Sequence, residues 1–444
     1  MNMSDAPQPV RIGVVGLGTV GSGVVRLLVD SADHIGRAAG RPIEVAAAVV
    51  RDPTKARDLP LPAARISTDI RTVSRDPSIT LAALLVGGLE PARSMMVELL
   101  EQGKDVVTAN KALLAEHGPE LFDLARRLGR SIAFEAAVAG GIPIVAAIGE
   151  CLAANRIESI RGILNGTSNF ILTRMEEDGS GYAEALALAQ SKGYAEADPA
   201  MDVDGTDATQ KLAILTHLAF GAWVPWKEIP RTGIDTVDAD LIRYAGELGY
   251  RIRLVALARR AEGRLSLRVA PALVRAGTPL AETRGAYNAV SIVGDAVGRM
   301  FFHGLGAGQM PTASAVVADI IDTVVGRAAI TFRTTGVLSA DTPTARLAGV
   351  DAMERHFLRI VVTDRPGVLA RITGILGDHG ISIASVIQHD PVDAGGGEAG
   401  GRPGVPLLIM THQARSSAVR GALDAIDSSD VVHGRSVCLG VLDE

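Results

Sequence analysis

The stretch that decides the fold is VRIGVVGLGTVGSGVVRLLV, residues 10–29. An apolar run leads directly into G-L-G-T-V-G, and the residues that follow continue with helical apolar spacing. A glycine-rich turn between a strand and a helix is typical of a loop that holds a dinucleotide pyrophosphate at the helix N-terminus. The predicted cofactor-binding residues are Gly16, Leu17, Gly18, Thr19, Val20 and Gly21. The competing interpretation, a purely structural turn, is disfavoured because motif, strand and helix agree.

Further apolar runs follow at residues 43–50, 79–88, 104–109 and 131–138, and they alternate with helical segments. Near-continuous apolar strands that alternate with helices are typical of a parallel sheet covered on both faces. We therefore predict an α/β fold whose first domain, residues 1–139, is a Rossmann-type parallel-sheet domain that binds NAD(P).

The pattern changes after this domain. Helical stretches at residues 182–192 and 206–220 stand among strands such as residues 251–260. We predict an α+β catalytic domain over residues 140–332. One long helix, residues 312–331, is predicted to close this domain.

The C-terminal part has a pattern of its own. A Thr- and Pro-rich region, residues 333–354, is predicted to be a linker. The order strand, helix, strand, strand, helix, strand over residues 355–444 predicts a ferredoxin-like (βαββαβ) domain. The Gly-rich residues 393–404 are predicted to form a hairpin loop within it.

Composition excludes several classes of protein. The 444 residues exceed what one core can hold, and the net charge of −6 comes without a basic patch for nucleic acid or an anionic membrane. The N-terminus lacks a signal-peptide pattern, and no apolar run approaches the length of a membrane span. Cys151 and Cys438 match no metal or disulfide spacing, and we predict that both are buried. We expect a cytoplasmic protein with neither nucleic-acid nor membrane partners.

The residues after the second predicted strand bear on the choice of cofactor. An NAD site usually places an acid there, whereas this chain has Arg51, with Lys55 four residues on. A guanidinium suits a 2′-phosphate, so we predict NADP, with NAD as the alternative. In that alternative Arg51 is only solvated and Asp52 reaches the ribose.

An acid-rich segment, GYAEADPAMDVDGTDATQK at residues 193–211, leads into a helix that carries a lysine. Asp207 and Lys211 are four positions apart and point to one side of that helix. A lysine there could donate a proton to a carbonyl oxygen while a hydride reaches the carbon. The competing interpretation is that Asp204 and Asp207 only cap the helix, and that Asp207 and Lys211 form an exposed ion pair. No divalent metal is predicted, because the segment has neither a nearby histidine nor calcium-loop spacing.

Seven motifs, in this order, closely resemble those of homoserine dehydrogenases, from about residue 10 to 330. They are GLGTVGSGV (16–24), VTANKALLA (107–115), FEAAVAGGIPI (134–144), ILNGTSNFIL (163–172), GYAEADP (193–199), DGTDATQKLAIL (204–215) and GAGQMPTASAVVADI (306–320). The resemblance implies the NAD(P)H-dependent interconversion of L-aspartate 4-semialdehyde and L-homoserine, on the route to threonine and methionine.

The same resemblance implies roles for individual residues. Lys211 corresponds to the proton donor to the aldehyde oxygen, Asp207 and Glu196 to acids that hold the substrate's amino group and hydroxyl, and Gly193 to a backbone contact beside them. Lys111 corresponds to a lysine near both cofactor and substrate, at the sheet edge where ligands bind.

The resemblance also implies a loop glycine and a cation site. Gly308 corresponds to a glycine that contacts the nicotinamide end of the cofactor. A structural monovalent cation, Na+, is implied, bound by one carboxylate and by main-chain carbonyls. The corresponding residues are Glu135, Val138, Gly140 and Ile142.

The C-terminal block resembles an ACT domain, a small-molecule sensor, chiefly through DRPGVLARITGILGDHGISIASV at residues 364–386. The resemblance implies amino-acid binding at a subunit interface and feedback inhibition, with L-threonine as the expected effector. The residues concerned are Asp364, Gly367, Val368, Leu369, Gly380 and Ile381. The competing interpretation is a ferredoxin-like domain that serves only dimerisation. Both interpretations predict an oligomer, a homodimer or a homotetramer.

Other polar residues receive structural roles. Asn165, Thr167 and Ser168 are predicted to form a polar loop that shapes the substrate pocket, not a nucleophile or a glycosylation site. His217 and His303 are predicted to be structural. Two further functions compete with the main one: a non-catalytic sensor of NADP and an amino acid, and a dehydrogenase of another amino-acid semialdehyde.

Overall fold

The computed structural model describes residues 8–62, 65–261, 264–334, 351–389 and 404–443. The chain forms two compact units, and each is assembled from separate stretches of sequence. Unit 1 lies within Met1–Ile160, Asp207–Ile229 and Tyr287–Ala345, and unit 2 within Arg161–Thr206, Pro230–Ala286 and Arg346–Glu444. We predicted four consecutive segments, 1–139, 140–332, 333–354 and 355–444. The compact units interleave along the chain and do not correspond to these segments, so the segment boundaries remain a prediction.

Unit 1 contains a six-stranded parallel sheet, which confirms the predicted α/β fold. Its order is β3-β2-β1-β4-β5-β6. The strands are β1 (Val10–Val15), β2 (Ile43–Val49), β3 (Ile66–Ser67), β4 (Ile79–Leu84), β5 (Asp105–Thr108) and β6 (Ile132–Ala133). The order reverses between β1 and β4, and ligands of such sheets bind in the crevice at the carboxyl ends of the strands there.

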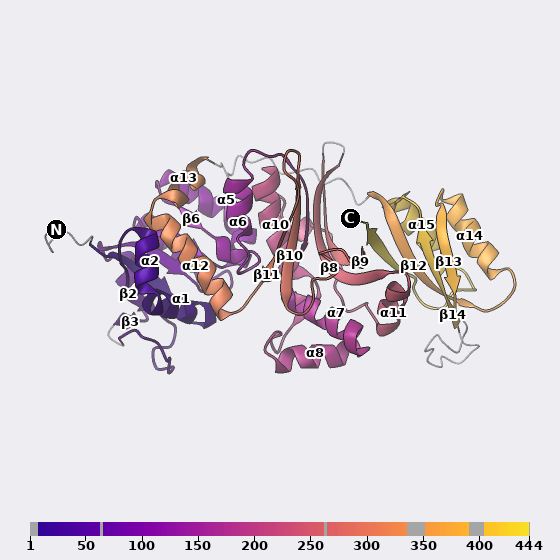
Figure 1. Ribbon diagram of the computed structural model, residues 1–444, viewed down its shortest axis with the longest axis horizontal. Helices are drawn as coiled ribbons and strands as arrows, with labels where there is room; N and C mark the ends of the chain where they lie inside the picture. The colour runs from indigo at the N-terminus through magenta and orange to yellow at the C-terminus, as the bar shows by residue number, and fades with distance from the viewer. Residues whose placement is uncertain (1–7, 63–64, 262–263, 335–350, 390–403, 444) are drawn as a thin grey trace. The chain divides into compact units, whose positions relative to one another are not determined.

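Helices cover this sheet, and one of them comes from far along the chain. The helices are α1 (Thr19–Asp30), α2 (Ala32–Ala39), α3 (Arg71–Ser74), α4 (Ala92–Glu101), α5 (Lys111–Arg127) and α12 (Gln309–Val324). In Figure 1, α12 lies beside α1 and α2. A Cβ on Gly23 of α1 would stand 2.8 Å from the Gln309 side chain and 3.0 Å from Ala313 Cβ, so the two helices approach closely because residue 23 has no side chain.

Unit 1 also holds part of the predicted catalytic domain. It includes η2 (Glu135–Ala137), α6 (Ile144–Ala146), η3 (Ala147–Cys151), α10 (Thr206–Phe220), η4 (Trp226–Glu228), and the antiparallel pair β10 (Tyr287–Gly294) and β11 (Gly298–Leu305). Strand β7 (Ile157–Ile163) runs across the boundary between the units.

Three sequence-based expectations were wrong. The helix predicted over residues 312–331 is interrupted: α12 ends at Val324, and α13 (Arg327–Thr334) follows. Gly326 lies between them with a φ of 85°, the left-handed conformation that terminates helices. The strand predicted at residues 131–138 shrinks to the two residues of β6, because the chain turns into the 3-10 helix η2. Cys151, at the end of η3, and Cys438, in β16 (Val437–Leu442) of unit 2, are free and exposed, whereas we predicted that both are buried.

Unit 2 combines a helical part with a long antiparallel pair of strands. The helices are α7 (Gly166–Asp178), α8 (Tyr182–Ser191), α9 (Ala200–Val203) and α11 (Ala239–Glu247). Strands β8 (Tyr250–Ala261) and β9 (Arg264–Arg275) pair over their full length. Arg253 of β8 is fully buried, and its guanidinium donates to Glu176 Oε2 at 2.8 Å and to the carbonyl of Ala281 at 2.7 Å.

The C-terminal part of unit 2 has the predicted ferredoxin-like order. Its elements are β12 (Met353–Thr363), α14 (Val368–Asp378), β13 (Ile383–Gln388), β14 (Gly404–Thr411), β15 (Ala414–Arg415), α15 (Ser416–Asp427) and β16 (Val437–Leu442). The sheet runs β16-β12-β14-β13, and apolar residues of α14 and α15 pack together on one face of it. This arrangement confirms the predicted fold class.

This small domain is not an isolated appendage of unit 2. The end of β16 pairs in parallel with β9, Gly440 with Ala272 and Leu442 with Val274, so one sheet continues from the β8–β9 pair into the C-terminal domain. Arg268 of β9 and Glu354 of β12 form an ion pair across β16.

Some predicted features fall outside what the structure describes. Most of the predicted linker and of the Gly-rich hairpin loop lies there. Within the described residues, no helix combines the length and the apolar character needed to cross a membrane.

Candidate active site

The structure brings the three predicted catalytic side chains of unit 1 together. Lys111 is the first residue of α5, directly after β5, and Asp207 and Lys211 lie one turn apart on α10. Lys111 Nζ is 2.8 Å from Asp207 Oδ1, and Lys211 Nζ is 2.7 Å from Asp207 Oδ2. One carboxylate therefore holds two ammonium groups, one through each oxygen.

Burial decides between the two interpretations of this pair. Only 6% of the Asp207 side chain and 10% of the Lys211 side chain are exposed, so the alternative of an exposed ion pair is wrong. Burial alone would raise the pKa of Asp207, but Lys211 and Lys111 outweigh it and hold the pKa well below its ordinary value. Asp207 is therefore an anion at any physiological pH.

Local sequence fixes both helices that carry these side chains. Asn110 caps α5: its Oδ1 accepts the N–H of Leu113 at 3.0 Å, and its Nδ2 donates to the carbonyls of Val86 and Gly88. Lys111 is thereby held at the carboxyl edge of the parallel sheet. At the start of α10, the Asp204 carboxylate accepts the N–H of Thr206 at 2.7 Å, so the capping role considered for Asp204 is confirmed.

The glycine loop of unit 1 has the geometry that its motif predicts. Gly16 has a φ of 101°, which suits the tight turn. A Cβ on Gly21 would stand 1.9 Å from the carbonyl oxygen of Gly16, so the third glycine allows the helix to pack on the loop. A Cβ on Gly18 would meet no atom within 4 Å. The loop is thus open where the backbone would approach a phosphate, at the N-terminus of α1.

The end of β2 carries one more cation than we singled out from the sequence. Arg51 and Asp52 are exposed there, and Asp52 Oδ1 accepts the N–H and the hydroxyl of Thr54 at 2.9 and 2.6 Å. The Arg57 guanidinium donates to the carbonyl of Asp52 at 2.9 Å and reaches that of Leu17 at 3.5 Å. Arg57 therefore bridges the glycine loop and the end of β2. Arg57 is the third basic residue within eight positions after β2, and this clustering is a sequence signal by which it could have been found.

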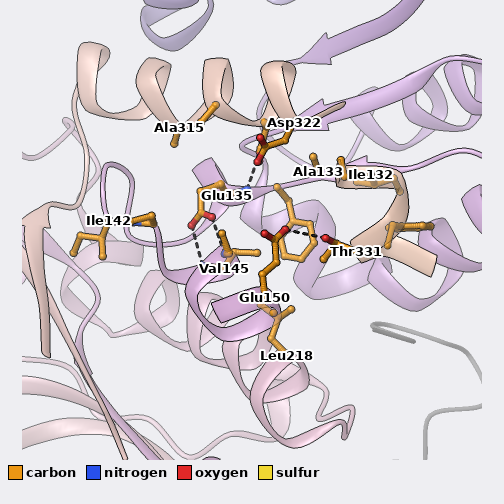
Figure 2. Close-up of a pocket in the computed structure, with 18 of the residues that line it drawn as sticks. Ile132, Ala133, Glu135, Ile142, Val145, Glu150, Leu218, Ala315, Asp322 and Thr331 are labelled. Carbon is orange, nitrogen blue, oxygen red and sulfur yellow. Dashed lines mark hydrogen bonds between the residues drawn. The ribbon is translucent and has the colours of Figure 1, made fainter. Parts of the chain in front are cut away.

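Glu135, the carboxylate of the predicted cation site, is buried beside a left-handed turn. Its two oxygens accept the N–H groups of Val145 and Ala146, each at 2.8 Å (Figure 2). Burial raises the pKa of Glu135 to about 6. Ala139 and Gly140 have φ angles of 56° and 51°, and a Cβ on Gly140 would stand 2.4 Å from the carbonyl oxygen of Gly306.

The donors of that site are oxygens alone. One carboxylate and the carbonyls of Val138, Gly140 and Ile142 are the ligand type that hard cations prefer. Among the described residues, no group of three or more His, Cys, Asp or Glu side chains could hold a metal. A site built from carbonyls leaves no such side-chain cluster, so the residues fit the predicted Na+.

The predicted substrate-binding residues Gly193 and Glu196 lie on one exposed loop of unit 2, after α8. Residues of the NGTS motif support this loop: Thr167 Oγ1 donates to the carbonyl of Tyr194 at 2.6 Å, and Asn165 Nδ2 donates to Asp202 Oδ1 at 2.8 Å. The motif therefore joins the start of α7 to the acid-rich segment, as expected for a polar loop that shapes a pocket.

Most of the predicted effector residues line a cavity of about 300 Å³ in the C-terminal domain. It is lined by residues 362–369 together with Gln388 and Leu407. Asp364, Gly367, Val368 and Leu369 are among them, whereas Gly380 and Ile381 are not, because they lie beyond the other end of α14.

The remaining residues singled out from the sequence are accounted for by local structure. His217 is buried, and burial, helped by Arg126, lowers its pKa to about 4, so its ring is neutral and packs edge-on against Trp223. The His303 ring stacks on Tyr287 with centroids 4.9 Å apart. Gly308 has a φ of 120° and directly precedes α12.

The site combines a parallel sheet, an intact glycine loop, and a buried lysine and carboxylate at the sheet edge. These features are those of an NAD(P)-dependent oxidoreductase, which here carries an additional ferredoxin-like C-terminal domain. Comparison with known proteins narrows this class. Residues 16–135 match the family model for the homoserine dehydrogenase NAD binding domain, residues 143–321 that for homoserine dehydrogenase, and residues 356–405 that for the ACT domain.

Individual relatives match between 71% and 98% of the chain. A homoserine dehydrogenase of Pseudomonas aeruginosa is 41% identical over 443 residues, which covers 98% of this chain and 99% of the relative. The crystal structure of a homoserine dehydrogenase from Thiobacillus denitrificans gives a TM-score of 0.89 at 41% identity and covers 98% and 99% of the two chains. A hyperthermophilic archaeal homoserine dehydrogenase mutant in complex with NADPH gives 0.59 at 27% identity, over 71% of this chain and 97% of the other. The chain belongs to the homoserine dehydrogenase family.

The glycine loop yields a test that separates cofactor binding from folding. Gly18→Ala should leave the melting temperature unchanged but raise the Kd for NADPH about tenfold or more, because the new methyl group stands where the phosphates approach. Gly21→Ala should instead lower the melting temperature, because its Cβ meets the backbone of Gly16.

Gly246→Ala serves as the control, because a Cβ there meets nothing within 4 Å and the residue lies inside helix α11. Thermal unfolding and NADPH fluorescence titration measure both quantities. Equal NADPH affinity in the Gly18→Ala variant and the wild type would contradict the role given to this loop.

Proposed function

We propose that this protein catalyses the reversible reduction of L-aspartate 4-semialdehyde to L-homoserine, with NADPH as the preferred reductant. The buried contact of Asp207 with Lys111 and Lys211 is the observation that supports this reaction best. Cys151 and Cys438 form no disulfide, in keeping with our proposal that the enzyme works in the cytoplasm.

In this reaction, bound NADPH supplies the hydride to the aldehyde carbon. Lys211 donates a proton from Nζ to the aldehyde oxygen as the alcohol forms, and takes a proton from the hydroxyl in the reverse direction. Asp207 fixes the position of Lys211 through Oδ2, and Lys111 through Oδ1. The positive charges of Lys211 and Lys111 stabilise the negative charge that develops on the substrate oxygen.

We assign substrate binding to Gly193, Glu196 and Asp207. Glu196 offers a carboxylate to the ammonium group of the substrate, and Gly193, with a φ of 74°, offers its backbone. The hydrogen bonds of Thr167 and Asn165 support the loop that carries both residues. A pocket built around a fixed amino-group partner should reject a semialdehyde one methylene longer, which distinguishes this enzyme from a dehydrogenase of another semialdehyde.

The carboxylate of Glu135 and the carbonyls of Val138, Gly140 and Ile142 would hold Na+. A cation there would balance a buried carboxylate whose pKa burial raises, and would stabilise the left-handed turn at residues 139 and 140. Gly308 is assigned to the nicotinamide end of the cofactor on the strength of the family resemblance.

Positive charge at the end of β2 supports the preference for NADP over NAD. Arg51 is exposed there, Arg57 is held against the glycine loop, and the carboxylate of Asp52 is engaged by Thr54. A guanidinium binds a 2′-phosphate well, whereas an engaged carboxylate is less available to ribose hydroxyls. The NADPH complex of the archaeal relative points the same way.

The C-terminal domain is proposed to bind L-threonine in the cavity at residues 362–369 and to inhibit the enzyme. Two strands that contribute to this cavity also hold the two ends of α11. Arg359 of β12 donates to Asp238 Oδ1 at 2.6 Å, and the same oxygen caps α11 by accepting the N–H of Leu241. His389, directly after β13, lies 3.2 Å from Glu247 and stacks on Tyr244.

Helix α11 contacts α7, whose first turn supports the substrate loop. A change at the effector cavity therefore has a continuous route to that loop within unit 2. Inhibition requires that the effector bind two states of this route with different affinity. The enzyme is proposed to act as a homodimer or homotetramer, because its C-terminal domain resembles ACT domains, which bind amino acids between subunits.

The first test of the function is turnover. Purified protein should oxidise NADPH when given L-aspartate 4-semialdehyde, and Lys211→Ala should lower kcat by about 10² to 10⁴ fold because the proton donor is lost. The Kd for NADPH should not change. Lys227→Ala is the matched control, because its side chain is 64% exposed.

Initial rates and NADPH fluorescence measure these two quantities. Loss of NADPH binding together with activity would indicate structural damage and remove the support for Lys211 as the donor. Absence of turnover in the wild type would leave the alternative of a non-catalytic sensor.

Cofactor choice can be tested at Arg51. Arg51→Ala should raise KM for NADPH about tenfold or more and leave KM for NADH nearly unchanged. The reason is that the variant lacks the guanidinium that pairs with the 2′-phosphate, and NADH has no such phosphate. Arg37→Ala, at another exposed arginine of unit 1, should change neither value. An equal effect of Arg51→Ala on both cofactors would contradict contact with the 2′-phosphate.

The regulatory route can be tested at Arg359. Arg359→Ala should raise the threonine concentration needed for half inhibition about threefold or more, with little change in the uninhibited rate. Arg420→Ala, at an exposed arginine of α15, is the control. Unchanged inhibition in the Arg359→Ala variant would separate α11 from the response to threonine.

A further inference from the structure

Unit 1 contains a second cavity, of about 370 Å³, that no step of the proposed reaction uses. Cavities of this size are typical of small-molecule sites. It shares Glu135 and Ile142 with the proposed cation site, but the glycine loop, Lys111, Asp207, Lys211 and Gly308 do not line it. Its walls come from β6, η2, α6, η3, α5, α10, α12 and α13 and from the loop between η2 and α6.

One part of the wall is apolar and largely aromatic. The Phe122 ring lies 5.3 Å from that of Phe134 and 5.3 Å from that of Phe332, so the three rings form a continuous surface. Ile132 and Leu218 extend it (Figure 2). Such a surface suits the apolar body of a ligand.

The other part of the wall is acidic. It bears the carboxylates of Glu135, Glu150, Asp319 and Asp322. Asp319 accepts the N–H of Glu135 at 2.8 Å, and Glu150 accepts the hydroxyl of Thr331 at 2.8 Å (Figure 2). Burial, and then the charge of Glu135, raise the pKa of Asp319 well above its ordinary value.

Basic side chains do not balance these acids inside the cavity. Among the residues that the structure describes, no lysine, arginine or histidine lines it. Arg327 pairs with Asp322, and Arg126 lies over the Phe332 ring without lining the cavity. Carboxylates gathered in a partly desolvated space favour a positively charged occupant and repel a negative one.

We propose that this cavity binds a small organic cation, a primary ammonium group carried on an aromatic or branched apolar body. The ammonium group lies against the carboxylate of Glu150, with buried Asp319 as a further hydrogen-bond acceptor, and the apolar body lies against Phe122, Phe134 and Phe332. An aromatic face also attracts the positive charge itself, so both parts of the wall favour the same occupant. A neutral analogue of equal shape fills the space but leaves the carboxylates unbalanced.

The test uses the full chain and a defined probe, 2-phenylethylammonium, with 2-phenylethanol as its neutral counterpart. Isothermal titration in phosphate buffer at pH 8 avoids competing buffer amines and keeps the probe charged. We expect the ammonium compound to bind. The Kd of the alcohol should be about tenfold higher or more. Equal binding of both probes, or binding of neither, would overturn the proposal.

Two variants with matched controls locate the binding. Glu150→Gln should weaken binding of the ammonium probe about tenfold and leave binding of the alcohol unchanged. Glu158→Gln, at an exposed glutamate of β7 outside the cavity, is its control. Ala328→Phe should abolish binding of both probes by filling the space, whereas Ala329→Phe, one residue further on the same helix and not lining the cavity, should not.

The same preparations report on folding and on the main activity. All four variants should reduce aspartate 4-semialdehyde at the wild-type rate without the probe, because none of these residues belongs to the reaction. Normal turnover together with unchanged probe binding in Glu150→Gln and Ala328→Phe would overturn this site and leave the proposed function intact.

Discussion

The arrangement of unit 1 depends on a single carboxylate that holds two lysines. Asp207 joins the end of a sheet strand, through Lys111, to helix α10, about 100 residues further along the chain, through Lys211. A buried ammonium group without a counter-charge is costly, so the carboxylate stabilises Lys211, whose side chain is 10% exposed, more than Lys111, whose side chain is 36% exposed. The parallel sheet and α10 are thus aligned by the same contact that positions Lys211, the proposed proton donor.

The sequence predicted those parts of the fold that local patterns determine. Apolar strands, glycines at residues 16, 18 and 21, and the alternation within residues 355–444 are short-range signals, and the sheets form where they indicate. The break at Gly326 was missed because the apolar spacing continues across it, and a single left-handed residue leaves no periodic signal. The exposure of Cys151 and Cys438 depends on tertiary packing, which composition does not reveal.

The candidate site was predictable in the same uneven way. Helical spacing alone places Asp207 beside Lys211, but the approach of Lys111 depends on tertiary structure, and only the family resemblance suggested it. Arg57 reaches the glycine loop because the chain folds back after β2, and the acids of the second cavity come from separate segments. Neither arrangement has a local pattern from which it could be deduced.

The parallel pairing of β16 with β9 has a consequence for the removal of the C-terminal domain. Residues 272–274 of β9 have their backbone groups satisfied by the last strand of the C-terminal domain. A chain cut before β12 would expose this strand as an open sheet edge, a surface prone to pair with other molecules. The C-terminal domain therefore protects an edge of the β8–β9 sheet from association with other chains, apart from the sensing role proposed for it.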